Sequence, residues 1–232
     1  MLTTARRLLL LLVLLSLPLA ARAEPIRDWS GPYAGLTLGV ADGSTRVTGN
    51  RFTYNQNRAV NRVDHDYRGG VFDGVAGWNW QRGRLVFGPE LSLGYGDLQS
   101  ALVFNTDNDI DQVRIDWQAS LTARLGVALG DALVYARTGL AFARTRNVGG
   151  DVNGGVLNLS DAHRRQTVDH GVTFGLGVEQ ALAANRRVRL EFSQTEFETY
   201  SLANQDGAPG SQVYVVENGP IRAVRIGLLW AF

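Results

Sequence analysis

The chain has 232 residues, with 22 acidic and 23 basic side chains, a formal net charge of +1 and no cysteine. A balanced charge argues against a nucleic-acid partner, because binding a phosphate backbone needs an excess of basic residues. Without the three arginines of its first 23 residues, the formal net charge falls to −2. The absence of cysteine excludes disulfide bonds, thiolate metal sites and a lipid-modified cysteine.

The first 23 residues have the three parts of a secretory signal peptide. Arg6 and Arg7 form the charged start, residues 8–17 form a short apolar core, and Ala21-Arg22-Ala23 is an A-x-A cleavage site. A transmembrane helix would need about 20 apolar residues, roughly twice the length of this run. We therefore predict that residues 1–23 are removed on export.

The remainder consists of a lead-in over residues 24–31 and a series of segments in which apolar and small or polar residues alternate. Successive side chains of a strand point to opposite faces, so this pattern predicts strands with one apolar face. Eight such segments are expected, at residues 33–40, 71–80, 85–95, 113–129, 133–143, 172–179, 188–193 and 224–232. The polar segments between them are alternately long and short.

The last segment shows the pattern most clearly. Its large residues alternate with Arg225, Gly227 and Ala231, and the chain ends on Trp230-Ala231-Phe232. A face of large apolar residues backed by small and polar ones is typical of a lipid-facing strand in a transmembrane barrel. We predict that Trp230 and Phe232 form a C-terminal assembly signal and that this strand binds the barrel-assembly machinery.

An even number of strands with alternating long and short connections is typical of bacterial outer-membrane barrels. Only closed barrels let strands cross lipid, because every backbone N–H and C=O must be paired. Residues 32–232 are therefore predicted to form an all-β, eight-stranded antiparallel transmembrane β-barrel with long extracellular loops and short periplasmic turns. Six aromatic residues are expected on its outer face: Trp78, Trp80, Tyr95, Trp117, Tyr135 and Trp230. Pro89 removes a ladder donor inside the third strand, which predicts a local bulge.

Several stretches resemble the small outer-membrane β-barrel proteins of the porin-family or opacity-like type, which are surface proteins of Gram-negative bacteria. They are WSGPYAG at 29–35, GVAGWNWQ at 74–81, GPE at 88–90, ARLG at 123–126, YARTGLA at 135–141, GLGVE at 175–179 and VRLEF at 188–192, together with the terminal strand. Pro89 departs from the family pattern. The resemblance implies an eight-stranded barrel in the outer membrane and no shared catalytic residues.

The inward faces of the predicted strands carry charged side chains. They are Glu90, Arg114, Asp116, Arg124, Arg137, Glu179, Arg189, Glu191 and Arg225. The interior of an eight-stranded barrel is just wide enough for side chains, and a buried charge is costly unless it is paired. We interpret these residues as an ion-pair plug that stiffens the barrel. A selective polar path for ions or small solutes is the alternative.

Two other features suggest chemistry more weakly. Acidic residues flank His65 and precede His170, so an Asp–His pair at the barrel rim could act as a general base in a hydrolase of lipid or peptide. The simpler interpretation is that His65, His170 and His163 are solvated loop histidines. Asp107, Asp109 and Asp111 have the spacing of a calcium loop, but Gln112 and Gln118 replace its glycine and glutamate.

The sequence therefore predicts an outer-membrane barrel with a structural and surface-interacting role, no enzymatic activity, no cofactor and no metal. The expected partners are outer-membrane lipids, lipopolysaccharide and the barrel-assembly machinery, with host or surface ligands for the loops. No separate periplasmic domain is expected.

Overall fold

The computed structural model describes residues 26–49, 62–100, 103–104, 109–153, 156–157, 163–198, 200–203 and 213–232. In these segments no helix combines the length and apolar character that crossing a membrane requires. The predicted signal peptide lies outside the described residues and stays a prediction.

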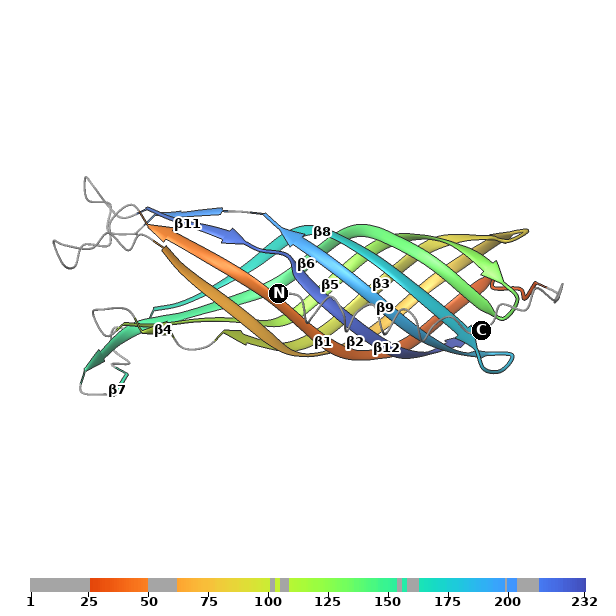
Figure 1. Ribbon diagram of the computed structural model, residues 1–232, viewed down its shortest axis with the longest axis horizontal. Helices are drawn as coiled ribbons and strands as arrows, with labels where there is room; N and C mark the ends of the chain where they lie inside the picture. The colour runs from red at the N-terminus through yellow and green to blue at the C-terminus, as the bar shows by residue number, and fades with distance from the viewer. Residues whose placement is uncertain are drawn as a thin grey trace, which may run out of the picture.

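Eight long strands form the wall of the molecule. They are β1 (Gly31–Gly49), β2 (Arg62–Arg82), β3 (Leu85–Ser100), β5 (Asp109–Leu129), β6 (Ala132–Asn153), β8 (His163–Ala181), β9 (Arg186–Phe197) and β12 (Ile221–Ala231). Each is antiparallel to its neighbours, and β1 pairs with both β2 and β12, which closes the ring. The strands are steeply tilted around a long barrel (Figure 1). The predicted eight-stranded barrel is confirmed.

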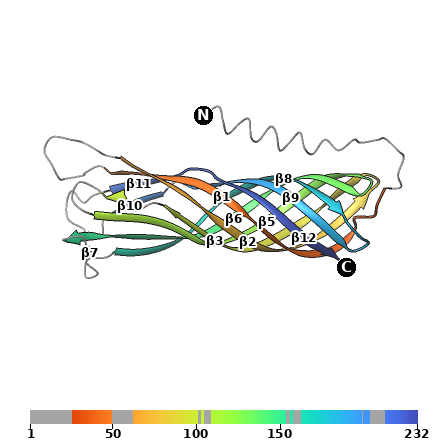
Figure 2. The same ribbon diagram turned by 60° about the horizontal axis from the view of Figure 1, so that its bottom comes forward.

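Four short strands extend one end of this wall. They are β4 (Val103–Phe104), β7 (Val156–Leu157), β10 (Tyr200–Ala203) and β11 (Val213–Asn218). They lie at the end opposite the C-terminus in both views (Figure 2). We call this the loop end, and we call the end with the short connections after β2, β5 and β8 the turn end.

The strands are longer at the loop end than the apolar pattern predicts. A loop was expected from Asp42 to Arg68, but β1 continues to Gly49 and β2 begins at Arg62. The same holds for the expected loops that begin at Asp97, Thr145 and Ser201, where strand pairing continues. Backbone hydrogen bonds do not require an apolar face, so hairpins extend where the alternation has already ended.

The outer face of the barrel is apolar. Leu38 is 61% exposed, Leu140 57% and Leu176 64%, although these are large hydrophobic side chains. Trp78, Trp80, Tyr95 and Trp117 are also exposed, and the rings of Trp80 and Phe87 lie 5.9 Å apart. A contiguous exposed apolar surface of this kind is typical of a lipid-facing barrel.

Tyr135 corrects the predicted set of outer aromatic residues. It is only 2% exposed and points into the barrel. Residues two apart on a strand share a face, so Tyr135 lies on the same side as the buried Arg137, while Val134 faces outward.

The predicted bulge at Pro89 is also wrong. Pro89 pairs with Ala123 in an unbroken β3–β5 register, and the β2–β3 ladder keeps the same alignment on both sides of it. The irregularities lie nearer the loop end, between Tyr95 and Leu98 in β3 and between Ile115 and Trp117 in β5.

The barrel interior is filled in layers. An apolar cluster near the loop end contains Ala41, Tyr67, Val71, Leu98, Ile115, Ala143, Ile221 and Ala223, with Phe197 against it. A second cluster at the turn end contains Trp29, Val86, Ala128, Leu133 and Tyr135, with Ala181 against it. Charged and polar side chains occupy the space between the two clusters.

Candidate functional site

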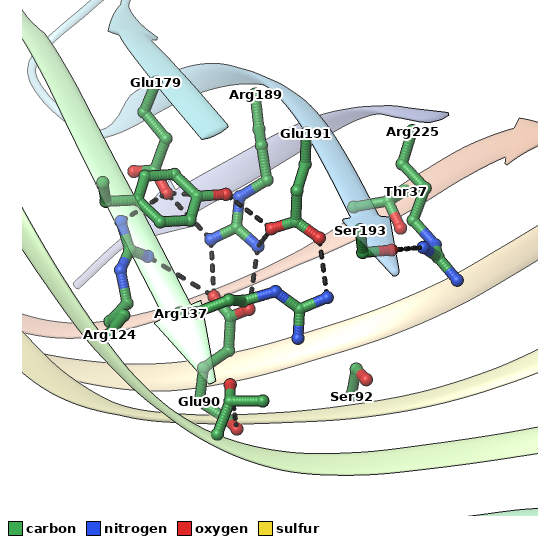
Figure 3. Close-up of polar contacts among 12 residues, drawn as sticks. Thr37, Glu90, Ser92, Arg124, Arg137, Glu179, Arg189, Glu191, Ser193 and Arg225 are labelled. Carbon is green, nitrogen blue, oxygen red and sulfur yellow. Dashed lines mark hydrogen bonds and ion pairs between the residues drawn. The ribbon is translucent and has the colours of Figure 1, made fainter. Parts of the chain in front are cut away.

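Six ionised side chains from five strands meet in the middle of the barrel. This central network consists of Glu90 on β3, Arg124 on β5, Arg137 on β6, Glu179 on β8, and Arg189 and Glu191 on β9 (Figure 3). None is more than 8% exposed. Three carboxylates face three guanidinium groups, and a fourth guanidinium, that of the buried Arg187, lies 3.8 Å from Glu179.

Arg189 is its centre. Its Nη2 lies 2.5 Å from Glu90 Oε2 and 2.8 Å from Glu179 Oε1, and its Nη1 lies 3.0 Å from Glu90 Oε1. One guanidinium group therefore joins β9 to β3 and to β8 across the interior. The planar fork of arginine suits such paired contacts with carboxylates.

Two further ion pairs extend the network. Arg124 Nη2 donates to Glu179 Oε1 at 2.8 Å, and Arg137 Nη2 donates to Glu191 Oε1 at 2.7 Å. Burying charges is costly, and this arrangement offsets the cost through short, multiple hydrogen bonds. A polar path along the barrel axis would have to pass through these contacts.

Two tyrosines that the sequence reading did not identify complete the network. The hydroxyl of Tyr33 donates to Glu90 at 2.6 Å and accepts from Arg124 at 2.7 Å, and that of Tyr135 donates to Glu191 at 2.6 Å. The Arg124 guanidinium also lies 4.1 Å from the Tyr135 ring centroid. In the cross-strand register, Tyr33 faces Gly77 and Tyr135 faces Gly177, where a Cβ would overlap each tyrosine. Such tyrosine–glycine pairs are a sequence signal that could have placed both rings inside.

A second polar group lies beside the central network, towards the loop end. Arg225 donates to Asp73 and to Ser193, both at 2.7 Å, and Thr37 donates to Asp73 at 3.3 Å. The sequence reading included Arg225 but missed Asp73, its partner on β2. The polar side chains here border a cavity of about 20 Å³, which has room for roughly one water molecule.

Arg114 and Asp116 do not contact the central network. The predicted inward placement of Arg114 is wrong, because its side chain is 39% exposed, whereas Asp116 is buried at 3% exposure. Arg114 donates to Asp97 and Tyr95, whose side chains are exposed, and Asp116 pairs with Arg144 and Arg146. The physical reason is the irregularity between Ile115 and Trp117, where one extra residue reverses the alternation. Ile115, expected outside, is instead buried in the loop-end apolar cluster.

The segment before β1 closes the turn end. The Trp29 side chain is fully buried, and the Arg187 guanidinium lies 4.6 Å from its ring centroid. The Trp29 amide donates to Gln81 at 2.6 Å, and Asn79 donates to the Trp29 carbonyl at 3.1 Å. Arg27 reaches Asp131 at 3.0 Å and the Ala183 and Ala184 carbonyls at 2.5 and 2.6 Å. The expected lead-in is thus a strap that ties together the ends of the hairpins.

The histidines and acidic residues of the loop end form no metal centre in the described segments. His170 Nε2 lies 2.9 Å from Glu198 Oε2, and both side chains are largely exposed, while Asp169 accepts instead from Thr145. No group of three or more potential metal ligands occurs among the described residues. The side chains of His65, His163, Asp109 and Asp111, and all of Asp107, lie outside them.

At the C-terminus, the Phe232 amide donates to the Pro32 carbonyl at 3.0 Å, and its side chain is 80% exposed. Trp230 pairs with Ala34 across the seam between β12 and β1. That these two residues form an assembly signal stays a prediction.

The geometry agrees with the comparisons to known proteins. Residues 8–217 match the family model described as "Outer membrane protein beta-barrel domain". The chain is 29% identical to a 22 kDa outer membrane protein of Rhizobium leguminosarum bv. viciae, over 77% of this chain and 71% of the relative. It is 27% identical to the 25 kDa outer-membrane immunogenic protein of Brucella abortus, over 80% and 75% of the two chains.

Among solved structures, the outer membrane protein OprG from Pseudomonas aeruginosa aligns with 90% of this chain and 99% of its own. The TM-score is 0.52 and the sequence identity is 10%, so this likeness concerns the fold. The loop end is accordingly extracellular and the turn end periplasmic. The chain belongs to the outer membrane protein β-barrel domain family and is a protein of the Gram-negative outer membrane.

Proposed function

We propose that the protein is a non-conducting barrel scaffold that anchors its extracellular end at the cell surface, where this end contacts other molecules. The observation that carries the proposal is the central network, in which Arg189 ties two glutamates together across the interior. In an eight-stranded barrel there is little space around such a cross-link. The Trp29 strap adds a second closure at the periplasmic end.

A role at the surface agrees with the extension of the wall beyond the apolar exterior. The strands continue into four short strands at the extracellular end, which raises polar backbone and side chains above the membrane. The Brucella relative is named an immunogenic protein, as expected of a surface-exposed barrel. We propose that this end supports envelope integrity and binds surface or host ligands.

A solute-flux assay tests the closed barrel. Vesicles that contain the refolded mature protein should swell no faster in small sugars than vesicles without protein, because the two closures leave no continuous path. Folding is checked by the heat-sensitive gel shift of barrel proteins. Swelling that follows protein content would favour the pore alternative.

We also propose that the barrel has no catalytic activity. The carboxylate that His170 contacts, Glu198, is largely exposed, whereas a hydrolase orients its histidine with a buried carboxylate. The variant His170→Ala should leave lipid A composition and surface proteolysis unchanged in cells that express the protein. A change in either property, at equal protein level, would revive the hydrolase alternative.

A further inference from the structure

Three arginines gather on the outer face of β5 and β6 near the extracellular end. We call Arg114, Arg144 and Arg146 the outer arginine cluster. Arg114 lies directly opposite Arg146 in the register, and Arg144 lies opposite Trp117. On its other side Arg144 pairs with Val168, which is 60% exposed. Directly paired residues share a face of the sheet, so the cluster points away from the barrel interior.

The cluster carries more positive than negative charge. Asp116 accepts from Arg144 at 2.7 Å and lies 3.1 Å from Arg146, and Asp97 accepts from Arg114 at 2.9 Å. Among the described side chains, three guanidinium groups thus share two carboxylates. Like charges directly opposite each other on a sheet destabilise it, and Arg114 and Arg146 have this arrangement. An additional anion would relieve the repulsion.

The arginine side chains remain open to such an anion. Those of Arg114, Arg144 and Arg146 are 39%, 33% and 43% exposed despite their ion pairs. Arginine presents several donors in a rigid fork, which matches the oxygens of a phosphate group.

The position of the cluster along the strands indicates the source of the anion. Tyr95, Trp117 and Phe142 are exposed aromatic residues on the same outer face: Trp117 lies opposite Arg144 and pairs with Tyr95, and Phe142 lies two residues from Arg144 towards the turn end. Aromatic belts mark the boundary between hydrocarbon and headgroups. Strands rise about 3.3 Å per residue, so the arginines lie within roughly 10 Å of this belt, at headgroup depth.

We propose that the outer arginine cluster binds the phosphate group of a phosphorylated lipid in the outer leaflet. The lipid is held at the surface where the cluster lies, so its local concentration exceeds that of a soluble anion. The inference depends on the membrane location and not on whether the barrel conducts. It assigns a specific contact site to the lipid partner expected from the sequence.

The test compares lipid binding by purified, folded protein in neutral detergent micelles. The informative variant is Arg114→Gln with Arg146→Gln, which leaves Arg144 to pair with Asp116, whose side chain is 4% exposed. Arg222→Gln is the matched control, because Arg222 is an exposed arginine on β12, separated from β6 by β8 and β9. The probes are diphosphorylated lipid A and the same lipid after removal of its phosphates.

Wild type and the Arg222→Gln control should bind diphosphorylated lipid A equally, and the double variant should bind it about fivefold or more weakly, because two charge-assisted contacts are lost. The dephosphorylated lipid should bind wild type as weakly as the double variant binds lipid A. Inorganic phosphate at the same concentration should leave the lipid bound. The proposal would be overturned if the double variant bound lipid A as tightly as wild type, or if the Arg222→Gln control lost as much affinity as the double variant. Displacement of the lipid by free phosphate would also overturn it.

Discussion

Replacing Arg189 with methionine is expected to lower the free energy of unfolding by about 3–5 kcal/mol. Methionine fills similar volume but leaves Glu90 in the interior without its main cation and removes one of the cations that pair with Glu179. Removing one partner of a buried ion pair costs far more than the pair contributes, since the remaining charges stay desolvated. Urea titration of the refolded barrel, followed by tryptophan fluorescence and gel shift, measures the change.

Two further variants make the comparison specific. Arg84→Met, in the exposed turn after β2, should change stability by no more than about 0.5 kcal/mol. Adding Glu90→Gln to Arg189→Met should recover part of the loss, because one unpaired carboxylate is then neutral. A loss below about 1 kcal/mol for Arg189→Met, or no recovery in the double variant, would show that the network contributes little.

Replacing Trp29 with alanine should have the second largest effect, a loss of about 3–4 kcal/mol. The substitution removes a fully buried indole and leaves a cavity next to Arg187, which also loses its stacking partner. The side chains of Asn79 and Gln81 form hydrogen bonds with the backbone of Trp29, so these contacts do not depend on the indole. The strap should therefore loosen while the eight strands remain paired.

The same urea titration measures this change. Ile26→Ala is the matched control, because Ile26 lies in the same segment but is 41% exposed. Its effect should stay within about 0.5 kcal/mol. Equal effects of the two substitutions would mean that the strap is a passive tail and that Trp29 does not close the periplasmic end.

The sequence predicts the barrel wall well because the wall depends on local alternation. Each strand that faces lipid must place large apolar residues at every second position, and this requirement is visible in segments such as 224–232. The same alternation assigns seven charged residues to the inner face, and all of them are buried or nearly so: Glu90, Arg124, Arg137, Glu179, Arg189, Glu191 and Arg225. Alternation is lost beyond the membrane, which explains why the extracellular extensions of β1 and β2 were expected to be loops.

What the sequence could not predict depends on contacts between distant segments. A single extra residue near Asp116 moves Arg114 to the outside, and no composition signal marks it. The partners of Arg124 include Tyr33, 91 residues away, so the pairing is visible only once the ring is closed. The strap formed by Arg27 and Trp29 likewise depends on turns from three hairpins that meet only in the folded barrel.

Single-channel conductance of the refolded mature protein in a planar bilayer is the most direct test of the closed barrel. The bilayer should remain silent, with folding confirmed by the heat-sensitive gel shift, because the central network and the Trp29 strap close the interior at two levels. Steady, reproducible openings of wild-type protein would contradict this account. They would mean that the buried arginines and carboxylates line an ion path.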